Sequence, residues 1–257
     1  FINVINVLYI FNLLPFEQPK MRLIYFALAF LLFGFSSAVL AGVVTENTRI
    51  IYNINKKEQS FQFVNINDYP VLVQLWVDDG SIDGTPEKAP DSPVIPLPAI
   101  FKLKSKETKS IRFVKVDDNL ATDRETLYWL TIYEVPPLPE KDSKPEDSAV
   151  LILTTRTQMK LLLRPAELFS QASNMASNMS YKWEDKSLVL INDSPFYLTI
   201  AALRLSDKED KSYYSGMLAP FSQITVAWDL ATKPESLVMT YLDDIGSQND
   251  FTIKVEK

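Results

Sequence analysis

The stretch SFQFVNINDYPVLVQLWVDDG, residues 60–80, contains the pattern that decides the fold class. Polar and apolar residues alternate along 60–66, which is the period of a β-strand with one buried face. A second apolar run at 71–77 ends at Asp78-Asp79-Gly80, a strong turn signal. Two short strands with turn residues after each of them predict a β-sheet protein.

The same pattern continues along the rest of the chain. Short apolar or alternating runs recur between turn residues, and this spacing is typical of β-sandwiches. The segment 83–98 is rich in Pro, Gly and Asp, so it is excluded from the centre of a sheet. Further strands are predicted at 43–52, 111–116, 127–135, 149–164, 187–191, 197–204, 223–228, 236–242 and 251–255.

The chain is long enough for two sandwiches, because one such domain takes about 100 residues. The boundary is predicted at Arg164-Pro165-Ala166, where the longest strand ends, which gives domains at 42–165 and 166–257. A polar stretch at 171–180 follows and contains a tandem repeat, ASNM at 172–175 and again at 176–179. We predict that this repeat forms a tolerant loop.

The first 41 residues have the pattern of an upstream extension followed by a signal peptide. From Met21 the sequence reads MRLIYFALAFLLFGFSSAVLA, with a positive charge, an apolar core and a small-residue cleavage site. Cleavage is predicted after Ala41, with Ala38 as the alternative. Residues 1–20 are interpreted as sequence upstream of the natural start. An N-terminal membrane anchor is the competing interpretation.

Composition excludes several classes of function. The 257 residues contain no His and no Cys, which excludes Ser-His-Asp catalysis, thiolate catalysis and zinc sites with Cys or His ligands. The net charge of −6 does not favour nucleic-acid binding. A carboxylate glycosidase could use Asp78-Asp79 or Asp243-Asp244, but neighbouring residues of a strand point to opposite faces. No catalytic, metal or cofactor residues are therefore assigned.

Several local motifs resemble the periplasmic pilus-assembly chaperones of the chaperone–usher pathway, the PapD-like family. They occur in the order and spacing of that family, and they cover most of the first domain. The motifs are Asn47–Tyr52, Tyr69–Asp78, Asp123–Leu130, Glu134–Pro137 and Thr157–Ala166, with Asn192–Tyr197 and Tyr241–Asp244 in the second domain.

The resemblance implies a fold and a function. The fold is all-β, with two immunoglobulin-like β-sandwich domains arranged as an L or boomerang around a cleft. The function is a periplasmic chaperone that binds, folds and caps pilus subunits by donor-strand complementation and delivers them to an outer-membrane usher. The resemblance implies no enzyme activity, no cofactor and no membrane span after signal cleavage. It also allows weak self-association of the chain through an exposed edge strand.

The resemblance also implies three groups of site residues. Arg49 and Lys160 would bind the C-terminal carboxylate of a subunit, although each residue taken alone is more typical of a solvated strand charge. An exposed edge strand would supply alternating side chains to a groove in the subunit, and a salt-bridge network would fix the angle between the domains. The donor residues are Leu151, Leu153 and Thr155, and the network residues are Glu125, Arg164 and Asp244.

Two further points concern the match to the family. Thr155 stands where family members commonly have a larger apolar residue, and Pro98 stands at a position that can be a cis proline. The alternative function is a secreted β-sandwich adhesin or structural pilus subunit. Such a protein would need neither a free edge at 151–155 nor a meeting of Arg49 with Lys160.

Overall fold

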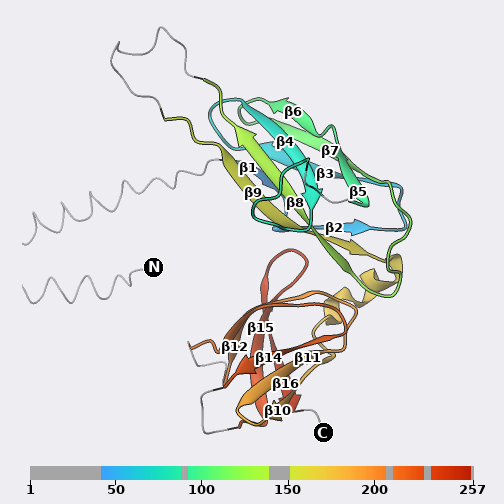
Figure 1. The fold of residues 1–257 in the computed structure, drawn as a ribbon, viewed down its shortest axis with the longest axis vertical. Helices are drawn as coiled ribbons and strands as arrows, with labels where there is room; N and C mark the ends of the chain where they lie inside the picture. Colours follow the sequence, from blue (N-terminus) through green and yellow to red (C-terminus); the bar gives the residue numbers. More distant parts are fainter. Residues whose placement is uncertain are drawn as a thin grey trace, which may run out of the picture. The chain divides into compact units, whose positions relative to one another are not determined.

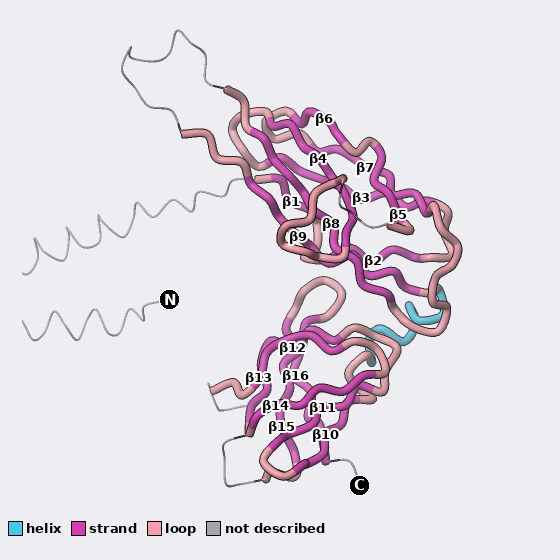
Figure 2. Tube along the Cα trace, in the orientation of Figure 1, coloured by secondary structure: helices cyan, strands magenta, loops and turns pink. Residues whose placement is uncertain are grey.

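The computed structural model describes residues 42–255 apart from 88, 90–91, 139–150, 207–210 and 229–232. The predicted extension and signal peptide at 1–41 lie outside the described residues. Within them, no helix is both long enough and apolar enough to cross a membrane. Nearly all of the regular structure is strand, and Figure 2 shows one helical segment in cyan after the first group of strands.

The strands from β1 to β9 form the two sheets of a first sandwich (Figure 1). Both sheets face one core, in which Phe63, Phe113 and Leu161 are fully buried. One sheet has the order β1 (Val43–Thr45), β3 (Glu58–Asn65), β7 (Thr108–Lys115), β5 (Val94–Leu97). The other has the order β2 (Arg49–Asn53), β9 (Thr155–Arg164), β8 (Thr126–Val135), β4 (Val71–Asp78), β6 (Ile100–Leu103).

The prediction of one strand over 43–52 was wrong. The segment forms two short strands in different sheets, because β1 pairs with β3 whereas β2 pairs in parallel with β9. Between them the Thr45 hydroxyl donates a hydrogen bond to the Asn47 carbonyl at 2.6 Å, which offers the backbone a partner outside either ladder. Strand propensity does not predict that the chain passes from one sheet to the other here, because 43–45 and 49–52 both contain apolar residues typical of strands.

The proline-rich segment 83–98 behaves as predicted, because its only described strand is at the edge of a sheet. That strand is β5, and it pairs on one side with β7. The peptide bond between Leu97 and Pro98 is cis, as the family position allowed. The short strand β6 follows at once and was not predicted.

The strands from β10 to β16 enclose a second core. They form one hydrogen-bonded sheet, and among the described residues a short parallel pairing of β10 with β16 alone joins its two halves. Both halves contribute to one buried cluster, with Tyr181 and Leu190 from one and Leu203 and Met239 from the other, so they form the two layers of a sandwich. The order is β13 (Tyr214–Leu218), β12 (Leu198–Arg204), β15 (Ser236–Leu242), β16 (Gln248–Val255), β10 (Met179–Glu184), β11 (Ser187–Asn192), β14 (Ser222–Ala227).

The tandem repeat is not a tolerant loop. The 3-10 helix η2 (Ala166–Asn174) occupies its start, and β10 begins at Met179. Met175, Ala176 and Met179 are buried in the second core. The Asn and Ser residues made the repeat appear polar, yet its spacing leaves the small and flexible apolar side chains free to pack inward. The strands β10 and β13 were also not predicted.

Candidate functional site

Arg49 and Lys160 lie side by side. The parallel ladder between β2 and β9 starts at this pair, with Arg49 opposite Lys160. Residues opposite each other in a ladder project to the same face of the sheet, so the two side chains share one face. The chain therefore brings together two cations that are far apart in the sequence.

The Arg49 guanidinium is buried and has few hydrogen-bond partners. The residue is 6% exposed, and its Nη1 donates one long hydrogen bond of 3.4 Å to the Leu242 carbonyl. Its Nε is buried and has no hydrogen-bond partner in the part of the chain that the structure describes. Burial lowers the pKa of Arg49, and the carboxylates of Asp244 and Asp243 partly offset this effect. A buried donor without a partner is costly and is available to an incoming acceptor.

Lys160 is in a similar position. Its Nζ donates to the Thr199 hydroxyl at 2.7 Å. Burial, followed by the nearby charge of Arg49, lowers the pKa of Lys160. Within the described residues, neither Lys160 nor Arg49 forms an ion pair with a carboxylate. Two adjacent cations without a counter-ion favour the binding of an anion.

Glu125, Arg164 and Asp244 form a connected ion-pair network. Arg164 Nε donates to Glu125 Oε1 at 2.7 Å, and its two terminal nitrogens donate to both oxygens of Asp244 at 2.6 and 2.7 Å. The Arg164 side chain is 1% exposed, as is that of Glu125, whereas that of Asp244 is 34% exposed. Glu125 Oε2 also accepts a hydrogen bond from the Tyr197 backbone N–H at 2.7 Å. The network therefore links the end of β9 and the residue before β8 in the first sandwich to loops of the second.

Burial and ion pairing oppose each other in this network, and although burial lowers the pKa of Arg164, the hydrogen bonds and charges of Asp244 and Glu125 raise it overall. Burial raises the pKa of Glu125, and the charge of Arg164 opposes that shift. The loop that carries Asp244 also contains Gly246, whose φ is +89° and where an added Cβ would lie 2.4 Å from Thr48 Oγ1. Glycine is required at 246 because the positive φ disfavours other residues and because Thr48, next to Arg49 in the sequence, leaves no room for a Cβ. The turn after β15 thus contacts both groups of residues: Asp244 binds Arg164, and the Leu242 carbonyl accepts a hydrogen bond from Arg49.

The predicted donor residues are exposed, but the strand is shorter than predicted. Leu151 is 81% exposed and Leu153 is 69% exposed. β9 begins at Thr155, so 151–154 are outside the strand, while 149–150 lie outside the described residues. β9 pairs with β8 from Thr155 onward, but with β2 only from Lys160. Because β2 starts at Arg49, the described residues leave one backbone edge of Thr155–Met159 without a strand partner.

Sequence reasoning missed the partners that come from the second sandwich. Thr199 receives the Lys160 ammonium, and the Tyr197 N–H binds Glu125. Both residues lie in the predicted strand 197–204, but an alternating pattern does not show which residue of a strand faces another domain.

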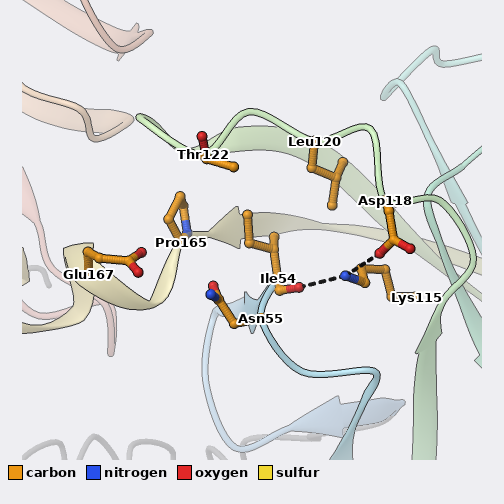
Figure 3. A pocket seen from close by; sticks show the side chains of 8 residues that line it. All are labelled: Ile54, Asn55, Lys115, Asp118, Leu120, Thr122, Pro165 and Glu167. Atoms are coloured by element: carbon orange, nitrogen blue, oxygen red, sulfur yellow. Dashed lines mark hydrogen bonds and ion pairs between the residues drawn. The ribbon is translucent and has the colours of Figure 1, made fainter.

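A hollow of about 400 Å³ lies where the first sandwich meets the start of η2, and its lining holds none of the predicted site residues (Figure 3). Lys115 on its wall donates to the Ile54 carbonyl at 3.0 Å and pairs with Asp118 at 2.6 Å. Its lining also includes Asn55, Leu120, Thr122, Pro165 and Glu167.

Comparison with known proteins gives the family. Residues 42–169 match the model of the PapD N-terminal domain of pili and flagellar-assembly chaperones, and 174–253 match that of the PapD C-terminal domain. The chaperone protein MrkB of Klebsiella pneumoniae is 34% identical over 88% of this chain and 96% of its own. The chain belongs to the PapD-like family of pilus-assembly chaperones. The exact domain boundary at 165 stays a prediction.

Other PapD-like chaperones agree with this assignment. The chaperone protein FanE of Escherichia coli is 28% identical over 87% of this chain and 95% of its own. The crystal structure of the Pseudomonas aeruginosa CupB2 chaperone superposes with a TM-score of 0.68 at 28% identity, covering 83% of this chain and all of the other. The two immunoglobulin-like β-sandwiches of the PapD-like family are thereby confirmed for this chain. The alternative of an adhesin or structural subunit is not favoured.

Proposed function

We propose that this chain is a periplasmic chaperone that binds, folds and caps pilus subunits and hands them to an outer-membrane usher. The observation that carries the proposal is the pairing of Arg49 with Lys160, two partly buried cations without a carboxylate partner among the described residues. Membership of a family of pilus-assembly chaperones supports the same function. The work of such a protein is binding, and no catalytic group is assigned to it.

The two cations suit the C-terminal carboxylate of a subunit. Arg49 offers its unpartnered Nε, and Lys160 offers an ammonium with only a hydroxyl partner. Hydrogen bonds between ionised groups are short and roughly twice as strong as neutral ones. Every polypeptide ends in a carboxylate, so this anchor would fix the position of a subunit's last residue whatever its side chain.

The exposed row beside the anchor suits the open groove of an unfinished subunit. Leu151, Leu153 and Thr155 are exposed, and the backbone edge from Thr155 to Met159 is free on one side in the described residues. A strand with a free edge can add to a second sheet by β-augmentation, and its alternate side chains then fill pockets of the partner. The same free edge would allow weak self-association when no subunit is bound.

The cellular location belongs to this proposal as well. The apolar segment after Met21 is a candidate signal peptide, and export would place the chain in the periplasm, where pilus subunits emerge. The usher as the receiving partner is proposed on the same family basis, since PapD-like chaperones act in the chaperone–usher pathway.

The test is co-expression with a pilus subunit and measurement of the subunit recovered in complex. Arg49→Ala and Lys160→Ala are each expected to reduce recovery by at least about tenfold, because a hydrogen bond to a charged group contributes about 1.5–3 kcal/mol. Arg112→Ala is the matched control, since the Arg112 side chain is 55% exposed and its ion pair with Glu58 lies at the surface. Unchanged recovery in the double variant of Arg49 and Lys160 would contradict the proposal.

A further inference from the structure

The proposed donor residues Leu151, Leu153 and Thr155 form an exposed row, called here the donor row. Arg156 follows Thr155 directly in the sequence, but its side chain does not belong to this row. It stands between Thr155 and Thr157, both of which are exposed. Because successive side chains of a strand point to opposite faces, Arg156 projects to the same face as Lys160 and away from the row. The sequence analysis assigned it no role.

The Arg156 guanidinium holds the loop that follows β4. Nη1 donates to the Ile82 carbonyl, and Nη2 donates to the Ser81 carbonyl at 3.1 Å. Nη2 also lies 3.7 Å from Asp78 Oδ2, and the guanidinium carbon is 5.5 Å from the centroid of the Trp76 ring. One side chain therefore connects β9 to a loop, a carboxylate and an aromatic ring.

The site that receives Arg156 is itself fixed. Asp78 is fully buried, and it accepts hydrogen bonds from Trp76 Nε1 at 2.8 Å, from the Thr131 hydroxyl at 3.2 Å and from the Gly80 N–H at 2.8 Å. Gly80 has a φ of +89°, and a Cβ there would lie 2.4 Å from the Trp129 ring. These contacts fix the end of β4 and the start of the loop at Gly80, directly before the two carbonyls that receive Arg156.

The segment that Arg156 holds has little other support. From Thr155 to Met159, β9 is paired with β8 alone among the described strands, and 151–154 are outside any ladder. A strand end that pairs with one neighbour only can fray or slip in register. A shift by two residues would move each donor side chain to the next pocket of the subunit groove. Lys160, by contrast, is held between two ladders.

We propose that Arg156 is a positioning residue that keeps the donor row in one register relative to the Arg49–Lys160 anchor. The inference rests on the proposed function, because it concerns how a bound subunit is aligned. Arginine is required because its planar fork reaches two carbonyls and a carboxylate together, whereas lysine is a single point charge. The anchor sets where the subunit ends, and Arg156 sets where the donor side chains lie.

The experiment measures register directly by disulfide cross-linking. The chain has no cysteine, so Thr155→Cys adds a single thiol to the row. A co-expressed pilus subunit carries one cysteine at successive positions along its groove, and the cross-linked fraction is measured at each position. With Arg156 present, one groove position is expected to dominate. With Arg156→Met, cross-linking is expected to spread to positions two residues away, with at least about tenfold faster dissociation of the subunit.

Three variants make this test decisive. Arg156→Lys keeps the charge and is expected to give an intermediate spread. Ile82→Ser removes an apolar side chain that is 90% exposed but keeps its carbonyl, so one dominant register is expected. Arg112→Met controls for the loss of a surface arginine. A single register in Arg156→Met, or an equal spread in Ile82→Ser, would overturn the inference.

Failure of this inference and failure of the proposed function have different signatures. If Arg49→Ala and Lys160→Ala prevent capture while Arg156→Met keeps one register, only the role of Arg156 is wrong. If the anchor variants capture subunits normally, the proposed function itself is wrong. Hydrogen exchange of the free protein gives a second measurement: Arg156→Met is expected to speed exchange at Thr155–Met159 and to leave β2 unchanged, and equal exchange would count against the inference.

Discussion

Arg49 and Lys160 are opposite each other at the first rung of the parallel ladder between β2 and β9. Burial lowers the pKa of both side chains, and the charge of Arg49 lowers the pKa of Lys160 further. A fold gains no stability from two like charges placed in this way. The proposed binding of a subunit carboxylate would restore the missing interactions.

The first prediction concerns the pH dependence of subunit binding. Burial and the charge of Arg49 lower the pKa of Lys160, so its ammonium loses its proton at a lower pH than an ordinary lysine. Affinity for a subunit carboxylate is therefore expected to be full below this lowered pKa. It is expected to fall as the pH rises through it, by at most about tenfold per pH unit.

The measurement is a titration of complex formation from neutral to alkaline pH. Lys160→Arg is the matched control, because arginine stays protonated across this range. The variant should show a flat profile over the pH range in which the unaltered protein loses affinity. Parallel profiles for the two proteins would show that another group titrates.

The second prediction concerns the ion-pair network of Arg164. Arg164→Met leaves the buried carboxylate of Glu125 without its cation and is expected to lower the free energy of unfolding by about 3–5 kcal/mol. Asp244→Asn removes a partner that is 34% exposed and is expected to cost about 1 kcal/mol or less.

Urea denaturation of the free protein measures both changes. Arg112→Met is the control, since its exposed ion pair with Glu58 is expected to contribute no more than about 1 kcal/mol. Equal losses for Arg164→Met and Arg112→Met would mean that the buried network does not stabilise the fold.

The third prediction concerns the tandem repeat at 172–179. Met179 is 5% exposed and belongs to the second core, so Met179→Ala is expected to cost about 2–5 kcal/mol through the cavity that it leaves. Ser177 is exposed, and Ser177→Ala is expected to change stability by no more than about 0.5 kcal/mol. Thermal unfolding of the two variants would separate them, and a small effect of Met179→Ala would restore the loop interpretation.

Much of the fold could be predicted from local pattern. The alternation at 60–66 and the run at 71–77 correspond to β3 and β4, and the proline-rich segment gave only an edge strand. The errors occurred where tertiary contacts overrule local preference. The segment 43–52 changes sheets, and the ASNM repeat packs its apolar residues inward although most of its neighbours are polar.

The sequence by itself determined the all-β class, the absence of thiol and imidazole chemistry, and the family motifs that singled out Arg49 and Lys160. These follow from residue type and short-range spacing, which the chain states directly. Only the tertiary structure decided that β2 meets β9 at these two residues, that β9 has a free edge beside them among the described strands, and that Arg156 braces this edge. Such relationships depend on strand pairing between distant segments, and period-2 alternation is the same whichever strands are neighbours.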